Sequence, residues 1–171
     1  VAGLNKEEEI TSLLTFFYLD SSPKNQYLRA LNFSKKLGGN FKNKLQSKNN
    51  KKIKIGYISA NLNDHPVSKI MESIFIYHDK KKFEINAYSL NNMEDKITKN
   101  LKNNFNSFSC ISSLSLQEAV IKIRSDNLDI AVDLMGYTNK NMIKIFKERI
   151  APIQINYLGF PGTTGISNMD F

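Results

Sequence analysis

Ile53-Lys54-Ile55-Gly56-Tyr57-Ile58-Ser59 is the stretch of sequence that decides the fold. Its isoleucines and tyrosine predict a buried β-strand, which ends at a polar loop containing His65 and Pro66. A helical pattern follows over residues 67–77, and an alternating strand pattern follows over residues 83–89. A strand, a helix and a second strand in this order predict a right-handed crossover between parallel neighbours.

The same alternation continues toward the end of the sequence. The further expected helices cover 94–104, 115–125 and 139–146, and the further expected strands cover 105–111, 128–134 and 153–158. Ser115 is placed to cap its helix, and Gly159 to Gly165 is expected to form a loop. We therefore predict an α/β fold with a doubly wound, mostly parallel, Rossmann-like sheet.

Upstream of the sheet, the apolar residues recur at helical spacing over 7–18 and 25–37. These segments predict two amphipathic helices, with a stop signal at Gly38-Gly39. One pair of helices sets no period, so a preceding helical repeat array remains a hypothesis. We expect a helical segment at 1–39, a polar linker at 40–52 and the sheet domain at 53–171.

The composition narrows the class of protein. The formal charge of +8, from 24 basic and 16 acidic residues, suits an anionic partner. The basic residues are mostly lysines without interleaved aromatic residues, which favours solvated lysines over nucleic-acid binding. No apolar run of about 18 residues and no secretory signal is present, so we expect no membrane partner and a cytoplasmic location.

The cysteine and histidine content excludes two kinds of site. Cys110 is the only cysteine, which excludes an intrachain disulfide, and His65 and His78 are the only histidines, too few for a structural zinc cluster. We expect Cys110 to be a small core residue. We expect His78 to be a charge at the C-terminus of its helix.

The loops that directly follow strands are the candidate ligand sites, because ligands of such sheets bind at the carboxyl ends of the strands. In the first of these loops, His65 directly precedes a helix, whose N-terminus disfavours a positively charged imidazole. A neutral, exposed imidazole can accept a proton or a hydrogen bond. The alternative is a helix-entry histidine that is hydrogen-bonded to the backbone.

Two later loops offer further candidates, each with a structural alternative. In Gly136-Tyr137-Thr138, the hydroxyls can bind a sugar, or the stretch is a turn in which Thr138 caps the next helix. Asp133, just before it, either faces the crevice or accepts hydrogen bonds from nearby backbone amides. The glycines of residues 158–165 either allow a ligand close to the backbone or are required for packing. This stretch matches neither the P-loop nor the dinucleotide fingerprint.

Five blocks of the sequence, taken together, resemble the O-linked N-acetylglucosamine transferase and SPINDLY family. The blocks are Ile55 to Ala60, Asp64 to Ser68, Phe83 to Ser89, Asp129 to Thr138 and Ala151 to Gly165. The resemblance covers Ile53 to Phe171 and, more loosely, the helices before it. The chain departs from the usual family pattern at Leu62, Ile150 and Phe160, where the last change removes a tyrosine hydroxyl.

The resemblance implies the first lobe of a two-lobed GT-B glycosyltransferase that follows tetratricopeptide repeats and needs no metal or other cofactor. Its partners would be a protein acceptor, a nucleotide-sugar and a C-terminal catalytic lobe that supplies most of the diphosphate contacts. By the same resemblance His65 is the catalytic candidate. The candidates for the sugar site are Pro66, Gly136, Tyr137, Thr138, Leu158, Gly159, Pro161, Gly162 and Thr163.

The expected reaction is transfer of N-acetylglucosamine from UDP-N-acetylglucosamine to serine or threonine hydroxyls of proteins. Two alternatives stay open: transfer of fucose from GDP-fucose, and a protein-binding module without catalysis. Val1 is not an initiator methionine, and residues 166–171 are expected to lead into another strand. We therefore expect a fragment of a longer protein that is inactive alone.

Overall fold

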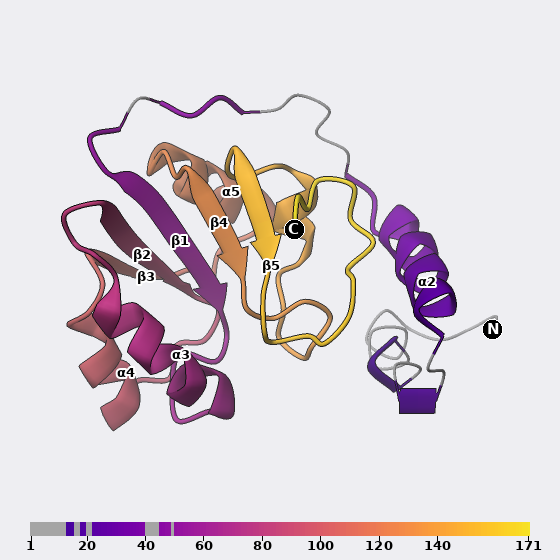
Figure 1. Ribbon diagram of the computed structural model, residues 1–171, viewed down its shortest axis with the longest axis horizontal. Coiled ribbons are helices and arrows are strands. Elements are labelled where there is room, and N and C mark those ends of the chain that lie inside the picture. The colour runs from indigo at the N-terminus through magenta and orange to yellow at the C-terminus, as the bar shows by residue number, and fades with distance from the viewer. Residues whose placement is uncertain (1–12, 16–17, 20–21, 40–44, 49) are drawn as a thin grey trace.

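Five parallel strands form one sheet in the computed structural model, which describes residues 13–15, 18–19, 22–39, 45–48 and 50–171 (Figure 1). The strands are β1 (Ile53–Ser59), β2 (Phe83–Ser89), β3 (Ser107–Cys110), β4 (Ile130–Asp133) and β5 (Ile153–Asn156). Their order is β3-β2-β1-β4-β5, with β1 pairing both β2 and β4. This confirms the predicted doubly wound sheet and places the topological switch point between β1 and β4.

Helices cover both faces of the sheet. They are α2 (Pro23–Lys36), α3 (Pro66–Tyr77), α4 (Lys96–Lys102), α5 (Leu116–Ser125) and α6 (Lys144–Lys147). Successive side chains of a strand point to opposite faces. Tyr57 of β1 therefore packs in one core cluster with Phe75 of α3, while Ile58 packs in the other with Ile123 of α5. The second cluster also includes side chains of α2 and α6, so these helices share the α5 face.

The helix ends follow the signals in the sequence. Ser115 caps α5 as predicted, and Glu118 completes a capping box with it. Gly38 and Gly39, with φ of +68° and +73°, terminate α2 as predicted. Most of the helix expected at 7–18 lies outside the described residues, although 13–15 and 18–19 are helical. The division into a helical segment, a linker and a sheet domain stays a prediction.

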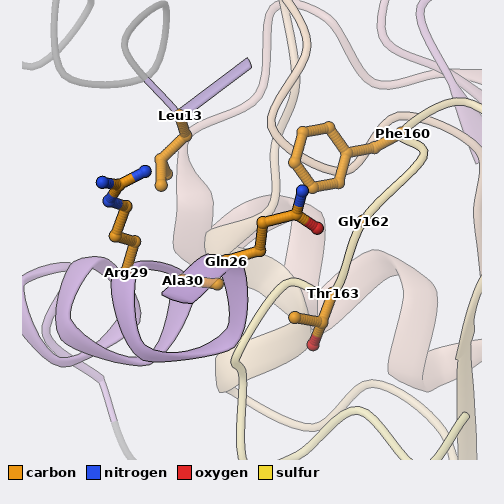
Figure 2. A pocket seen from close by; sticks show the side chains of 7 residues that line it. All are labelled: Leu13, Gln26, Arg29, Ala30, Phe160, Gly162 and Thr163. Atoms are coloured by element: carbon orange, nitrogen blue, oxygen red, sulfur yellow. The ribbon is translucent and has the colours of Figure 1, made fainter. Parts of the chain in front are cut away.

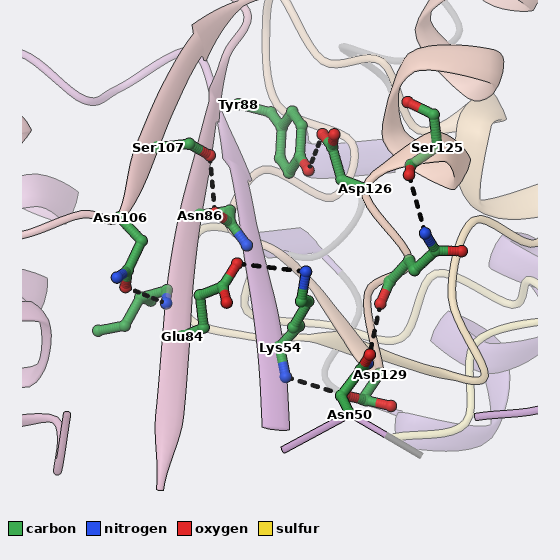
Figure 3. A network of polar contacts seen from close by, with 12 residues as sticks. Asn50, Lys54, Glu84, Asn86, Tyr88, Asn106, Ser107, Ser125, Asp126 and Asp129 are labelled. Atoms are coloured by element: carbon green, nitrogen blue, oxygen red, sulfur yellow. Dashed lines mark hydrogen bonds and ion pairs between the residues drawn. The ribbon is translucent and has the colours of Figure 1, made fainter. Parts of the chain in front are cut away.

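A polar network ties the segment before β1 to the starting ends of the strands (Figure 3). The Asp129 carboxylate accepts hydrogen bonds from the Asn50 amide at 3.0 Å, the Lys54 backbone N–H at 2.9 Å and the Ser47 hydroxyl. The Lys54 ammonium also lies 3.4 Å from the Glu84 carboxylate. These contacts anchor the sheet at the end opposite to the loops considered as candidate sites.

The helix expected at 139–146 is wrong, because only Lys144–Lys147 is helical. The asparagines before it bond to nearby backbone instead: the Asn141 side chain accepts from the Ile143 N–H at 3.1 Å, and the Asn139 side chain accepts from the Lys140 N–H. Lys140 has a φ of +59°, which ends any helix there. Side-chain bonds of this kind compete with helical ones.

Two single-residue expectations are also wrong. Cys110 is exposed, because it ends the edge strand β3. His78 is no helix-end charge: its Nε2 lies 2.8 Å from the Tyr57 hydroxyl, and burial lowers its pKa below the ordinary value, which favours the neutral form. Among the described residues, no helix is long and apolar enough to cross a membrane.

Candidate functional site

The carboxyl ends of β1, β4 and β5 bring three loops side by side (Figure 1). We call them the β1 loop (residues 60–65), the β4 loop (134–143) and the β5 loop (157–165). Backbone bonds extend the ladders into them, from the Leu134 N–H to the Ile58 carbonyl at 3.0 Å and from the Tyr157 N–H to the Asp133 carbonyl at 2.9 Å. All the predicted site residues lie in these loops or at the first residue of α3.

His65 is the N-cap of α3. Its Nδ1 accepts a hydrogen bond from the Val67 N–H at 3.1 Å, and Pro66 occupies the first helical turn. Since Nδ1 is the acceptor, the proton of the neutral ring is assigned to Nε2. His65 is half-buried, so part of the residue is accessible to solvent. His65 is thus a helix-entry histidine hydrogen-bonded to the backbone, which was the structural alternative. Its second ring nitrogen, Nε2, takes no part in this bond.

Helix α4 anchors the β1 loop through two residues that the sequence patterns did not single out. The Asp95 carboxylate accepts from the Thr98 N–H at 2.7 Å and from the Asp64 N–H at 2.6 Å, and these bonds lower its pKa. The Thr98 hydroxyl donates to the Leu62 carbonyl at 2.9 Å. The aspartate three residues before a threonine, at a helix start, was the available signal, but nothing in it indicates the long-range contact to residue 64.

Met135 joins the β1 and β4 loops and was likewise missed. Its sulfur lies 3.3 Å from the Ala60 backbone nitrogen, 3.4 Å from the Ser59 hydroxyl and 3.4 Å from the Asn61 amide. Thioether sulfur is a weak acceptor, so three donors around it act mainly by close packing. The floor of the switch point is therefore a buried methionine, which no polar sequence motif signals.

Asp133 folds the β4 loop. Its carboxylate accepts from the Met135 and Gly136 N–H groups, both at 2.9 Å, and Gly136 has a φ of +53°. Burial raises the pKa of Asp133 to about 7, even though the two backbone bonds act in the other direction. Asp133 was expected either to face the crevice or to accept hydrogen bonds from nearby backbone amides, and the structure shows the second arrangement.

Tyr137 and Thr138 make contacts within the protein. The Tyr137 hydroxyl donates to the Thr164 carbonyl at 2.6 Å, and the residue is 1% exposed. The Thr138 hydroxyl donates to the Met135 carbonyl at 2.8 Å and caps no helix, so its expected N-cap role is wrong. Direct contact of either hydroxyl with a sugar stays a prediction.

Glycines let the β4 and β5 loops approach each other. A Cβ added at Gly159 would lie 1.7 Å from the Leu134 carbonyl oxygen, and one added at Gly136 would lie 2.3 Å from Cβ of Phe160. Gly159 therefore serves packing, which was the structural alternative for the glycines of residues 158–165, and Gly136 has the unusual backbone conformation expected of a turn there. The exposed residues of the β5 loop are Tyr157, Leu158, Pro161 and Thr163, with Gly162 half-buried.

The far end of the β5 loop is also anchored. Buried Arg149 donates to the Asn168 carbonyl at 2.7 Å and pairs with the Asp170 carboxylate at 2.8 Å. The Gln154 amide donates to the same Asn168 carbonyl, also at 2.7 Å. Beyond them, Phe171 bonds along the outer edge of β5 in a parallel pattern, through Gln154 and Asn156.

A small cavity separates the β5 loop from the helical segment (Figure 2). Its lining comprises Leu13, Gln26, Arg29, Ala30, Phe160, Gly162 and Thr163. Its volume of about 20 Å³ accommodates about one water molecule, too little for a sugar ring. This cavity is therefore not the candidate site, which we place at the carboxyl edge of the sheet, where the three loops meet. Among the described residues, no group of three or more histidine, cysteine or acidic side chains is placed to hold a metal.

Comparison with known proteins identifies the family. Residues 25–171 match the model of glycosyl transferase family 41. The chain belongs to glycosyltransferase family 41. This membership agrees with the resemblance found in the five sequence blocks and covers α2 as well as the sheet.

Two curated relatives of this family 41 chain share 34% identity with it. One is the probable UDP-N-acetylglucosamine–peptide N-acetylglucosaminyltransferase SEC of Arabidopsis thaliana, matched over 71% of this chain and 12% of the relative. The other is the UDP-N-acetylglucosamine–peptide N-acetylglucosaminyltransferase of Caenorhabditis elegans, matched over 72% and 11%. The family 41 chain thus spans about one eighth of the length of these relatives.

A solved structure shares the fold of this family 41 chain. It is a mutant of the O-GlcNAc transferase of Thermobaculum terrenum, with a TM-score of 0.88 and 24% identity over 97% of this chain and 33% of that one. The agreement includes α2, so the seating of this helix beside the sheet is part of the shared fold.

Proposed function

We propose that this family 41 chain is the N-terminal, acceptor-side lobe of a cytoplasmic protein O-N-acetylglucosaminyltransferase. A preceding helical region would present protein acceptors, and a second lobe would hold most of the nucleotide diphosphate. The observation that carries the proposal is the convergence of the β1, β4 and β5 loops at one switch point, in a family whose curated relatives bear the name of this activity.

In the proposed reaction a serine or threonine hydroxyl oxygen attacks the anomeric carbon of UDP-N-acetylglucosamine. The new carbon–oxygen bond forms as the bond to the diphosphate breaks, UDP leaves, and the hydroxyl proton passes to a base or to solvent. No metal takes part in this proposal, so the charge developing on the diphosphate must be stabilised by protein donors. The backbone of the exposed β5 loop would shape one wall of the sugar pocket.

The geometry favours a donor role for His65. With Nδ1 bonded to the Val67 N–H, the proton of an uncharged ring is on Nε2, which leaves this ring without a free lone pair. We infer that His65 holds the sugar or orients the acceptor through this donor. Acting as the base would require the capping bond to open and the ring to change tautomer.

Two substitutions at one position separate the chemistry of His65 from its capping. In the full-length gene product, His65→Ala removes both the imidazole and the cap, whereas His65→Asn removes only the imidazole because asparagine is a good N-cap. Both variants should lose about 100-fold in turnover, because the sugar or the acceptor would be misplaced. Only His65→Ala should lose about 1 kcal/mol of stability, a fall in Tm of about 2–4 °C.

The assay is intact-mass analysis of an acceptor peptide incubated with the protein and UDP-N-acetylglucosamine. A mass gain with the wild type supports the transferase, and a gain only with GDP-fucose would support the fucosyl alternative instead. Wild-type turnover in both variants would remove His65 from the mechanism. No gain with either donor would favour a binding module.

A further inference from the structure

The Tyr137 ring lies where α2, the β4 loop and the β5 loop meet. It packs edge-on against Phe33 of α2, with ring centroids 5.1 Å apart, and against Phe160 of the β5 loop at 5.7 Å. Edge-to-face pairs of this kind stabilise a specific ring orientation. Tyr137 therefore connects two segments that are far apart in the sequence.

The Tyr137 hydroxyl adds a directional contact to this packing. It donates to the Thr164 carbonyl at 2.6 Å, in a position with 1% exposure. Burial, and secondarily the Asp133 carboxylate, raises the pKa of this phenol above its ordinary value. The group therefore stays protonated and remains a donor across the physiological range.

The next carbonyl of the same loop is held from the other side. The Ser34 hydroxyl of α2 donates to the Gly165 carbonyl at 2.7 Å. A Cβ added at Gly165 would lie 2.4 Å from the Ala30 carbonyl carbon, so α2 rests directly on the loop backbone. Two consecutive carbonyls are thus bound by hydroxyls from two different segments, one in the sheet domain and one in α2.

We propose that Tyr137 is a positioning residue that, together with Ser34 of α2, holds the end of the β5 loop so that its exposed residues face the crevice. This inference rests on the proposed function. It implies that the position of α2 affects the part of the β5 loop proposed to contact the sugar, because Ser34 of α2 and Tyr137 donate hydrogen bonds to adjacent carbonyls of that loop. Tyr137 then acts through Thr164, without contact to the sugar.

Tyr137→Phe in the full-length protein tests this role, with Tyr88→Phe as the matched control. Both rings are buried, and each hydroxyl donates one short hydrogen bond. The Tyr137 hydroxyl donates to the Thr164 carbonyl at 2.6 Å, whereas the Tyr88 hydroxyl donates to the Asp126 carboxylate at 2.7 Å, away from the loop. We expect Tyr137→Phe to lower kcat about tenfold while the Kd for UDP is unchanged, because misplacement of a wall penalises the reacting geometry. Tyr88→Phe should lower Tm comparably and leave kcat at the wild-type value.

Hydrogen exchange of residues 159–166 provides the second readout. The amides of this segment should exchange faster in Tyr137→Phe and in Ser34→Ala, but not in Tyr88→Phe. Unchanged exchange, or faster exchange with unchanged kcat, would overturn the proposal. A wild-type protein that transfers no sugar contradicts the proposed function instead, and exchange then still reports whether Tyr137 holds the loop.

Discussion

Asp129 and Asp133 lie at the two ends of β4, and the pKa values of their carboxyl groups are shifted in opposite directions. At Asp129, burial is outweighed by hydrogen bonds from the Lys54 N–H and from Ser47 and Asn50, so its pKa is lowered. At Asp133, burial outweighs two backbone bonds and the pKa rises to about 7. Asp133 is the more deeply buried of the two, and it lacks the side-chain donors that Asp129 has; both causes contribute to the difference in pKa.

Asp133→Asn should therefore change how stability depends on pH. A carboxyl with a folded-state pKa of about 7, above its ordinary 3.8, favours folding when protonated. Its contribution is complete below about pH 4 and is lost as the pH rises toward 7, since the folded state binds more protons over this range. Urea unfolding from pH 4 to 8 should show a decline in the wild type that is smaller in Asp133→Asn.

Asp129→Asn is the control for that experiment. Its lowered pKa places its own contribution at lower pH, where stability is lost as the pH falls below about 4. Asp129→Asn should leave the change in unfolding free energy between pH 4 and 7 the same as in the wild type. An identical slope in the wild type and Asp133→Asn would show that Asp133 ionises in the folded protein as it does in water.

At the scale of the elements, apolar periodicity predicted most of the sheet. The patterns at 53–59 and 83–89 gave β1 and β2 with the same bounds, because long apolar strands leave little ambiguity. The pattern at 139–146 failed because the asparagines there bond to their neighbours. The position of Cys110 on the sheet edge and the bond of His78 to Tyr57 depend on tertiary contacts, which local patterns do not contain.

The candidate site was predictable in its location and not in its supporting contacts. Strand-end loops led to His65, Gly136 and Gly159, because the carboxyl edge of a parallel sheet is a general ligand position. Met135 and Asp95 were missed, since their contacts with the β1 loop join segments that only the folded sheet brings together.

Asp95→Ala should loosen the loop that carries His65, because it removes the cap of α4 and the bond to the Asp64 N–H together. Amides of residues 61–67 should exchange several-fold faster. Ser115→Ala is the control: it removes the cap of α5 at a cost of about 1 kcal/mol and touches no residue of the β1 loop. Equal exchange of the loop in both variants would show that Asp95 acts only as a cap.

At the scale of the whole molecule, α2 and the sheet domain form one packed body. Phe33 belongs to the same core cluster as Ile58 of β1, and the buried Lys147 ammonium donates to the Ser34 carbonyl at 2.6 Å. The helical segment therefore contributes directly to the core of the lobe. Unfolding of α2 should accompany unfolding of the sheet in a single transition.

Two glycine substitutions measure this docking. Gly165 and Gly38 have φ of +62° and +68°, so alanine at either pays the left-handed backbone cost of about 1 kcal/mol. Only at Gly165 does the new methyl group meet α2, which adds about 1–3 kcal/mol of overpacking. Gly165→Ala should therefore have a lower Tm than Gly38→Ala, with a difference of about 2–4 °C for each kcal/mol of overpacking. Equal melting temperatures would indicate that α2 is loosely seated.

The contact of α2 with Gly165 also has a consequence during synthesis. Ser34 leaves the ribosome 131 residues ahead of its partner, an interval on the order of ten seconds at ordinary translation rates. Ser59 is likewise synthesised 76 residues before its partner Met135. The β1, β4 and β5 loops are thus completed late, and a nascent chain paused before residue 165 still lacks the loop segment that packs against Ala30 of α2.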